Sequence, residues 1–405
     1  SVSNYLDFTD YASMGNGDSV PILNYVYPEN ISHAQTELKK TTAIMELFNR
    51  LFGPYPFAKE KYGHADFGWG GGMEHQTMSF MGSYSFDLVT HELAHQWFGN
   101  KITCASWSEL WLNEGFATYA SGLAYENLDD FYWLPWKKIM MDRAKIQADM
   151  SIFIEDTSDV QRMFNENTYY KGAALLHMLR WKIGDEAFFG AVLKYLQDPQ
   201  LSYSTATTNE LKTHFEKESS ENLTEFFNDW YLGKGFPSYQ FSWNFKNGHF
   251  LLKANQSSSH ESVAFFEMPI PIRVYGSSQD SLLRLSHDFN GQLFQIELPF
   301  EVDSVSFNDD LMLLTGNSNI KKEHLLAEKG LQSPKTSIFP NPSKSHFTVT
   351  HFCENCQKKI SCTNQVGELI FELDSYATQE IVDASMWASG SYFLTVQDGF
   401  SSTTH

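Results

Sequence analysis

The chain has 405 residues, of which 49 are Asp or Glu and 29 are Lys or Arg, so its formal net charge is −20. Residues 1–236 hold 18 basic and 31 acidic side chains, and residues 237–405 hold 11 and 18. Because neither half is basic, the composition argues against nucleic acid and anionic membranes as partners. Apolar residues make up 42% of the chain, and the 10 Trp, 19 Tyr and 33 Phe residues are enough for several folded cores.

Two kinds of segment, a transmembrane span and a signal peptide, are not predicted by the sequence. No run approaches 18 consecutive apolar residues, so no transmembrane segment is predicted. The N-terminus, Ser1 to Tyr5, lacks a basic region followed by an apolar one, so no signal peptide is predicted in this chain. We therefore interpret the sequence as a piece of a longer polypeptide.

The first half of the chain reads as mainly helical. A turn at 15–18 and a short strand at 22–27 precede a helix that we expect to begin at a capping box, Ser32 to Gln35, and to end at Gly53-Pro54. Further helical periodicity covers residues 86–98, 116–125, 172–183 and 186–196, with a Gly-rich break at 68–72.

At Pro237 the apolar period changes to that of strands. Asn247-Gly248 and Asn290-Gly291 each separate two alternating runs and predict two hairpins. Residues 237–318 are thus predicted to be a small β-sandwich, 319–334 a charged linker, and 335–405 a second small β domain.

The strongest chemical motif is His91-Glu92-Leu93-Ala94-His95. On a helix the two imidazoles lie one turn apart on one face and can reach a single ion, while Glu92 can reach a water beside it. Catalytic zinc usually takes a third protein ligand, and Glu114 is the next candidate. Eighteen residues separate it from His95, and it lies in a Trp-Leu-Asn-Glu-Gly-Phe-Ala run. The alternative is a chance motif on a surface helix with unrelated acidic neighbours.

These residues resemble the zinc aminopeptidases related to aminopeptidase N and leukotriene hydrolase. Gly71-Gly72-Met73-Glu74-His75 is similar to that family's Gly-Ala-Met-Glu-Asn segment, and residues 169–173 are similar to its Tyr-x-Lys-Gly segment. The resemblance covers residues 20–236 strongly and 237–318 loosely. It implies an α+β multidomain protein: a mainly helical, thermolysin-like catalytic domain at 21–236, followed by two small β-sandwich-like domains.

The resemblance also implies roles for the site residues. His91, His95 and Glu114 would hold one Zn²⁺ per chain, and Glu92 would be the general base that acts on the zinc-bound water. Glu74 would hold the free α-ammonium of a peptide, and the backbone of Gly71, Gly72 and Met73 would pair with the substrate as an edge strand. Tyr169 rather than Tyr170 would stabilise the oxyanion, a choice that the motif makes and the residues alone leave open.

The departures from the family pattern also matter. Gly72 stands where Ala is usual and His75 where Asn is usual, and the extra imidazole could alter the pH dependence. The family's N-terminal β domain is absent apart from a remnant expected at 1–20, and its C-terminal helical domain is missing. Met73, Met78 and Met81 could line a side-chain pocket or belong to the core, and Lys171 is expected to be structural.

The last segment resembles the C-terminal sorting domains of the type IX secretion system, through Ile338 to Pro342, the turn at Gly367 and the run Gly390 to Leu394. It implies export to the cell surface or the medium through the secretion machinery. Cys353, Cys356 and Cys362 lie in this tail near His351, and a disulfide among the three is favoured over structural zinc. Cys104 is predicted to be a buried free thiol.

The sequence therefore predicts a secreted zinc aminopeptidase that acts on peptides with a free N-terminus. The alternatives are an inactive binding module, a hydrolase of another substrate such as a lipid epoxide, and a thermolysin-like endopeptidase.

Overall fold

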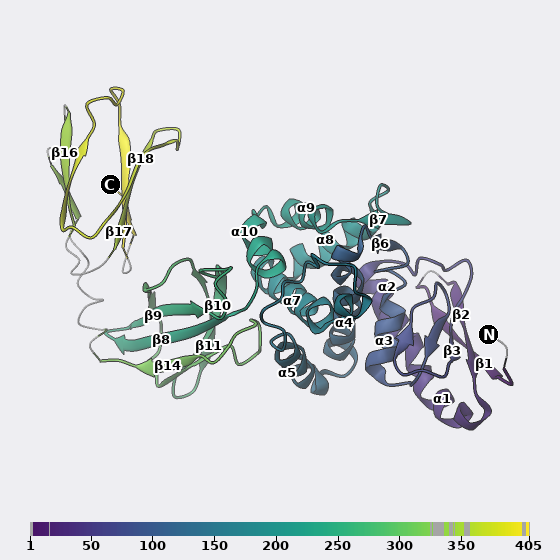
Figure 1. Cartoon of the computed structure of the whole chain (residues 1–405). Coiled ribbons are helices and arrows are strands. Elements are labelled where there is room, and N and C mark those ends of the chain that lie inside the picture. The colour runs from purple at the N-terminus through teal and green to yellow at the C-terminus, as the bar shows by residue number, and fades with distance from the viewer. Residues whose placement is uncertain are drawn as a thin grey trace. The chain divides into compact units, whose positions relative to one another are not determined.

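The computed structural model describes residues 3–15, 17–324, 326, 336–339, 343, 345–351, 357–398 and 402–404 (Figure 1). It divides into two compact units. The first contains residues 1–236 together with 258–266 and 309–315, and the second contains 237–257, 267–308 and 316–405. Two short segments from the second half of the sequence thus complete the first unit.

A five-stranded sheet opens the first unit, in the order β1-β2-β3-β5-β4. Its strands are β1 (Leu6–Ser13), β2 (Ser19–Val26), β3 (Tyr62–Asp66), β4 (Gly72–Met73) and β5 (Ser79–Met81). The predicted domain remnant at 1–20 is not separate: β1 pairs along its whole length with β2, and β2 runs parallel to β3. Alternate residues of β2 are buried, and the hairpin of β1 and β2 is part of the first unit's own sheet. β4 lies at the edge and pairs only with β5 among the described residues.

Helices form the rest of the first unit, and they place the site. Their bounds are α1 (Ile31–Glu37), α2 (Thr41–Phe52), α3 (Phe86–Ala94), α4 (Trp111–Leu128), α5 (Trp133–Arg143), α6 (Val160–Met163), α7 (Gly172–Ile183), α8 (Asp185–Gln197), α9 (Thr208–Ser219) and α10 (Thr224–Phe227). π-Helical turns span Asn167–Lys171 and Asn228–Leu232. A short parallel pair joins β6 (Ile102–Cys104) to β7 (Ser204–Ala206).

The first predicted helix is two helices, α1 and α2, separated by a 3₁₀ turn at Leu38–Lys40, and its start differs from the prediction. α1 follows a 3₁₀ turn at Pro28–Asn30, and its first position has no side-chain cap, so the predicted capping box at Ser32 is wrong. Its end was predicted correctly: Gly53 has a φ of 84°, a conformation that glycine adopts without strain. None of the described helices is long and apolar enough to cross a bilayer.

Two sheets form the β-sandwich in the second unit. One has the order β12-β9-β8-β14 and the other β11-β10-β13. Their strands are β8 (Pro237–Lys246), β9 (His249–Ser258), β10 (Met268–Tyr275), β11 (Asp280–His287), β12 (Gln292–Glu297), β13 (Ser304–Phe307) and β14 (Asn319–Lys322). Phe307 on one sheet lies 5.1 Å from the Tyr239 ring and 4.8 Å from the Phe241 ring on the other, so aromatic side chains fill the interface.

One turn prediction is confirmed in this domain, while a second turn and the predicted linker are wrong. Asn247 and Gly248 both have positive φ and connect the neighbouring strands β8 and β9, as predicted. By contrast, β11 pairs with β10 while β12 pairs with β9, so Asn290-Gly291 carries the chain between sheets and is not a hairpin. β14 pairs in parallel with β8, so residues 319–322 belong to the sandwich and not to the predicted linker.

The tail has strands β15 (Thr336–Phe339), β16 (His346–His351), β17 (Lys358–Asn364), β18 (Leu369–Ser375), β19 (Gln379–Asp383), β20 (Tyr392–Asp398) and β21 (Ser402–Thr404). They form two sheets, β15-β16-β19 and β18-β17-β20-β21. The buried core draws on both, with Val349 and Val382 from one sheet and Ile360, Cys362, Leu394 and Val396 from the other. Cys362 is a buried free thiol, so the predicted disulfide is left to Cys353 and Cys356, which lie outside the described residues.

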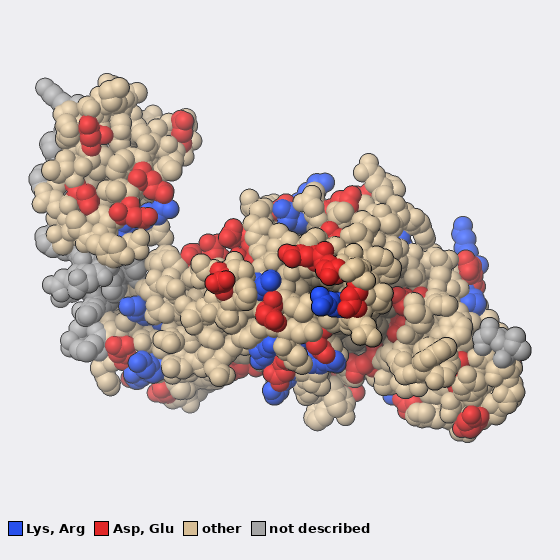
Figure 2. Space-filling view, viewed as in Figure 1, with Lys and Arg blue, Asp and Glu red and all other residues tan. Residues whose placement is uncertain are grey.

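The charge is distributed as the sequence suggested. On the face shown in Figure 2, Lys and Arg side chains are scattered among Asp and Glu, with no continuous basic surface over the part of the chain that is described.

Candidate active site

α3 carries the two histidines of the motif. Ser85 caps the helix by accepting the Leu88 N–H at 3.4 Å, and Val89, Leu93 and Ala94 are buried against the rest of the unit. α3 ends at Ala94 rather than at 98, but the His95 N–H still donates to the His91 carbonyl at 3.2 Å. The two imidazoles therefore remain one helical turn apart on one face.

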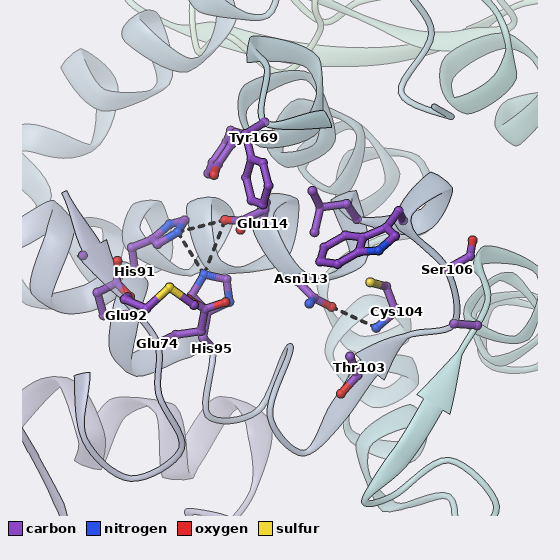
Figure 3. Close-up of a pocket in the computed structure, with 16 residues that line it drawn as sticks. Glu74, His91, Glu92, His95, Thr103, Cys104, Ser106, Asn113, Glu114 and Tyr169 are labelled. Atoms are coloured by element: carbon purple, nitrogen blue, oxygen red, sulfur yellow. Dashed lines mark hydrogen bonds and ion pairs between the residues drawn. The ribbon is translucent and has the colours of Figure 1, made fainter. Parts of the chain in front are cut away.

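α4 brings Glu114 to these imidazoles (Figure 3). Its Oε2 lies 3.1 Å from His91 Nε2 and 3.4 Å from His95 Nε2, and the two Nε2 atoms are 3.0 Å apart. The three ligand atoms all lie within 4.8 Å of one another, the grouping that a single ion requires. Two imidazole nitrogens and a carboxylate oxygen are the donor set that zinc accepts, so the residues fit that ion.

The surroundings of the triad fix its geometry. His95 is 1% exposed and its Nδ1 lies 3.0 Å from the Phe98 carbonyl, which leaves Nε2 directed toward Glu114. Burial alone would raise the pKa of Glu114, but the nearby imidazoles outweigh it and hold that pKa well below its ordinary value. Glu114 is thus kept as a carboxylate, the form that a metal requires.

Glu92 lies beside the triad without belonging to it. It is 4% exposed, and its Oε2 has no hydrogen-bond partner in the structure. Burial raises the pKa of Glu92 to about 8, against the partly compensating charge of His95. A buried carboxyl group with a raised pKa, lining the same cavity as a donor set for zinc, makes Glu92 a candidate for proton transfer.

The edge strand β4 borders the other side of Glu92. A Cβ added to Gly72 would lie 2.2 Å from Glu92 Oε1, so the glycine lets the carboxyl group lie against the strand. The Glu74 backbone is anchored by Asn100, whose Nδ2 donates to the Glu74 carbonyl at 2.8 Å. Gly72, Met73 and Glu74 all line the cavity that contains the triad, whereas Gly71 does not.

The two neighbouring tyrosines are separated by the structure. Tyr169 lines the cavity, and its ring centroid lies 6.0 Å from that of His91. Tyr170 instead accepts a hydrogen bond from Arg143 at 2.5 Å, and that guanidinium also pairs with Glu166. Of the two phenols, only that of Tyr169 lines the cavity, and its part in the chemistry stays a prediction.

A close helix contact determines where Tyr169 lies. A Cβ on Gly115 would be 3.1 Å from the Cα of Gly172, so α4 and α7 approach through two glycines. Glu114 precedes the first glycine, and Tyr169 lies in the π-helical turn just before the second. This contact thus brings the carboxylate and the phenol to one cavity.

The cavity has a volume of about 570 Å³ and extends beyond the predicted residues. Thr103, Cys104, Ala105, Ser106, Trp107, Leu110, Asn113 and Phe164 also line it. Asn113 belongs to the motif run around Glu114, but most of the others lie on β6, on the segment that follows it and after α6, where no motif marked them. Cys104 forms no disulfide but is only half-buried, so its predicted full burial is wrong. Of the three methionines, Met73 lines the cavity and Met81 is buried in the core.

Comparison with known families agrees with this geometry. Residues 36–230 match the model of the peptidase family M1 domain, a span that contains the triad, Glu92, Glu74 and Tyr169. Residues 36–230 are a peptidase family M1 domain. Residues 337–405 match the secretion system C-terminal sorting domain.

Curated relatives carry aminopeptidase names. The chain is 27% identical over 319 residues to aminopeptidase M1-A of Oryza sativa subsp. japonica, an alignment of 74% of this chain and 35% of the relative. It is 27% identical over 241 residues to leucyl aminopeptidase of Saccharolobus solfataricus, covering 58% and 28%. The chain therefore spans about a third of the length of the relatives that it matches.

The M1 domain and its neighbours also resemble a solved structure. Legionella pneumophila aminopeptidase A, in complex with aspartic acid, aligns with a TM-score of 0.67 at 19% identity. The alignment covers 78% of this chain and 38% of that one. At this identity the likeness concerns the fold, a multidomain arrangement of helices and small sheets.

Proposed function

We propose that this chain is the catalytic part of an exported zinc aminopeptidase that removes N-terminal residues from peptides. The observation that carries the proposal is the convergence of His91, His95 and Glu114 in one cavity with the edge strand β4 and Glu74. His91 Nε2, His95 Nε2 and Glu114 Oε2 would hold one zinc ion. When bound, that ion would polarise the scissile carbonyl and lower the pKa of a water toward ~7.

Substrate binding is assigned to the edge strand and its acidic neighbour. The free edge of β4 can pair with an extended peptide, and Gly72 permits close approach. Glu74 follows the strand and can hold the peptide's α-ammonium by a charge-assisted hydrogen bond. A carboxylate at this position selects a free N-terminus, because an acylated one offers no charge to pair with it.

Proton transfer is assigned to Glu92. Its carboxylate would accept a proton from the attacking water and later donate it to the leaving amine. A bound dication favours the ionised form of a nearby carboxyl group, so the high pKa of Glu92 in the metal-free protein does not prevent this role. The Tyr169 hydroxyl would donate a hydrogen bond to the oxyanion as it develops.

Export is assigned to the tail. Its match to a sorting domain supports recognition by a secretion system and release to the cell surface or the medium. On the face shown in Figure 2, Lys and Arg are scattered among Asp and Glu, so this face offers no continuous basic surface for nucleic acid.

The test compares zinc-loaded protein on free and N-acetylated aminoacyl substrates and on an internally cleavable peptide. We expect turnover of the free amine alone, and none after chelation of the metal. Equal cleavage of both aminoacyl substrates would contradict the aminopeptidase proposal, and cleavage of the blocked peptide alone would favour an endopeptidase.

A further inference from the structure

A second cavity of about 410 Å³ lies on the first unit beside β4. It shares only Met73 with the lining of the catalytic cavity. Six of its eight lining residues carry aromatic rings, namely Tyr5, Tyr27, Phe67, Trp69, His75 and Phe80, and the other two are Gly68 and Met73. Trp69 is 75% exposed and Met73 is 44% exposed, an unusual exposure for large apolar side chains that lie together.

The rings of this aromatic cavity are held by their neighbours. Tyr5 and Tyr27 are stacked with centroids 5.3 Å apart, and the Tyr5 hydroxyl donates to the Asp66 carbonyl at 2.6 Å. Phe67 lies 5.6 Å from Trp69 and 6.2 Å from Phe80, centroid to centroid. The walls therefore come from β5 and from segments that adjoin β1, β2 and β3, and the cavity is largely formed before any ligand binds.

The lining of this cavity contains no acidic side chain, but a carboxylate binds the backbone of one lining residue. None of its eight lining residues is Lys or Arg. Behind Tyr27 lies the buried carboxylate of Asp66, which accepts the Tyr27 N–H and the Asn30 amide, each at 2.9 Å, and the Tyr84 hydroxyl. All three donors are neutral, so among the described residues no cation offsets this carboxylate.

We propose that the aromatic cavity binds an organic cation of the alkylammonium class. Aromatic faces attract such a cation through their quadrupoles, and the buried carboxylate adds a favourable potential. A neutral apolar group would gain only the contact area and not the charge interaction. This inference concerns a site apart from the triad and does not depend on the proposed peptidase activity.

The test measures binding of choline and of its uncharged isostere 3,3-dimethylbutan-1-ol to the full chain by calorimetry. We expect saturable binding of choline with a Kd at least ~5-fold below that of the alcohol. Equal affinities would overturn the proposal and mark the cavity as merely apolar. Absence of saturable choline binding would also overturn it.

Two variants sharpen the result. Trp69→Leu keeps an apolar side chain but removes the ring, and it is expected to weaken choline binding at least ~3-fold while the alcohol is unaffected. The matched control is Phe131→Ala, a 78% exposed aromatic residue that lines neither cavity, and it should leave choline binding unchanged. Unchanged binding in Trp69→Leu, or an equal loss in Phe131→Ala, would contradict the assignment.

Discussion

The metal-binding half and the substrate-binding half of the candidate site are built in different ways. The triad lies on two packed helices, where His95 and Glu114 are 1% and 5% exposed and the ligand atoms contact one another directly. The substrate half is a two-residue edge strand followed by a partly exposed acid, Glu74. In the first half the three donor atoms already lie together, whereas in the second the outer edge of β4 pairs with no other described strand.

This difference predicts different consequences of mutation. In the metal half, each side chain has a charged partner in a dry environment, so its loss leaves another polar group unpaired. In the substrate half, the outer edge of β4 and the Glu74 carboxylate are the groups that we assign to the peptide, so a change there should alter KM and specificity more than metal content.

The largest effect is expected in the triad itself. Glu114→Gln removes the charged ligand between the two imidazoles, and we expect loss of stoichiometric zinc and of essentially all turnover. Zinc content by atomic absorption and hydrolysis of a free aminoacyl substrate measure both. The matched control is Glu166→Gln, an acid paired with Arg143 outside the cavity lining, which should keep its zinc.

A slightly smaller effect is expected at Glu92. Glu92→Gln keeps the shape of the side chain but removes its proton transfer, so kcat should fall by about 10²–10⁴ with zinc retained. Loss of zinc together with activity would instead make Glu92 a ligand and would undo the assignment of the triad.

The metal half was the more predictable from sequence, and the reason is physical. The spacing of His91 and His95 is a local property of one helical turn, so it survives even though α3 ends four residues earlier than predicted. Glu114 is different, because β6 and a 3₁₀ turn separate it from His95. The residues alone made it a candidate, and the family resemblance implied its role as a ligand.

Long-range pairing set the limits of prediction elsewhere. Asn290-Gly291 has the same local signal as Asn247-Gly248, yet its flanking strands join different sheets because their partners β9 and β10 come from earlier in the chain. The aromatic cavity was also invisible in the sequence, since Tyr5 and Tyr27 meet Phe67 and Phe80 only through the order of the sheet.

The two neighbouring tyrosines, Tyr169 and Tyr170, test whether the phenol that lines the cavity takes part in the reaction. Tyr169→Phe should lower kcat by about 10²–10³ with little change in KM, because it removes one donor to the oxyanion. Tyr170→Phe is the matched control: it removes only the hydroxyl that accepts from Arg143 and should stay within a few-fold of the parent. Similar losses in both variants would point to a general disturbance of the π-helical turn.

In the substrate half, Glu74→Gln removes the charge that we assign to the α-ammonium. We expect KM for free aminoacyl substrates to rise ~10- to 100-fold, with zinc retained, because a hydrogen bond to a charged group is worth about 1.5–3 kcal/mol. The preference over N-acetylated substrates should fall by a similar factor. A variant that lost activity but kept that preference would place the ammonium elsewhere.

The smallest effect is expected in the number of protons released when zinc binds, and not in the rate of hydrolysis. In the metal-free protein, burial would lower the pKa of His95, but the Glu114 carboxylate outweighs it and raises the pKa to about 10. We therefore expect the His95 imidazole to be in its cationic form at pH 7, so that zinc binding displaces the proton on Nε2. Calorimetry of zinc binding in buffers of different ionisation enthalpy should show release of about one proton per ion at pH 7. As pH falls, further protonation of the ligands should weaken zinc binding, and a pH-independent affinity between pH 6 and 8 would show that the imidazoles are already neutral. In that case the three ligands would bind zinc without losing a proton. The metal half would then differ from the substrate half in its burial and not in its charge.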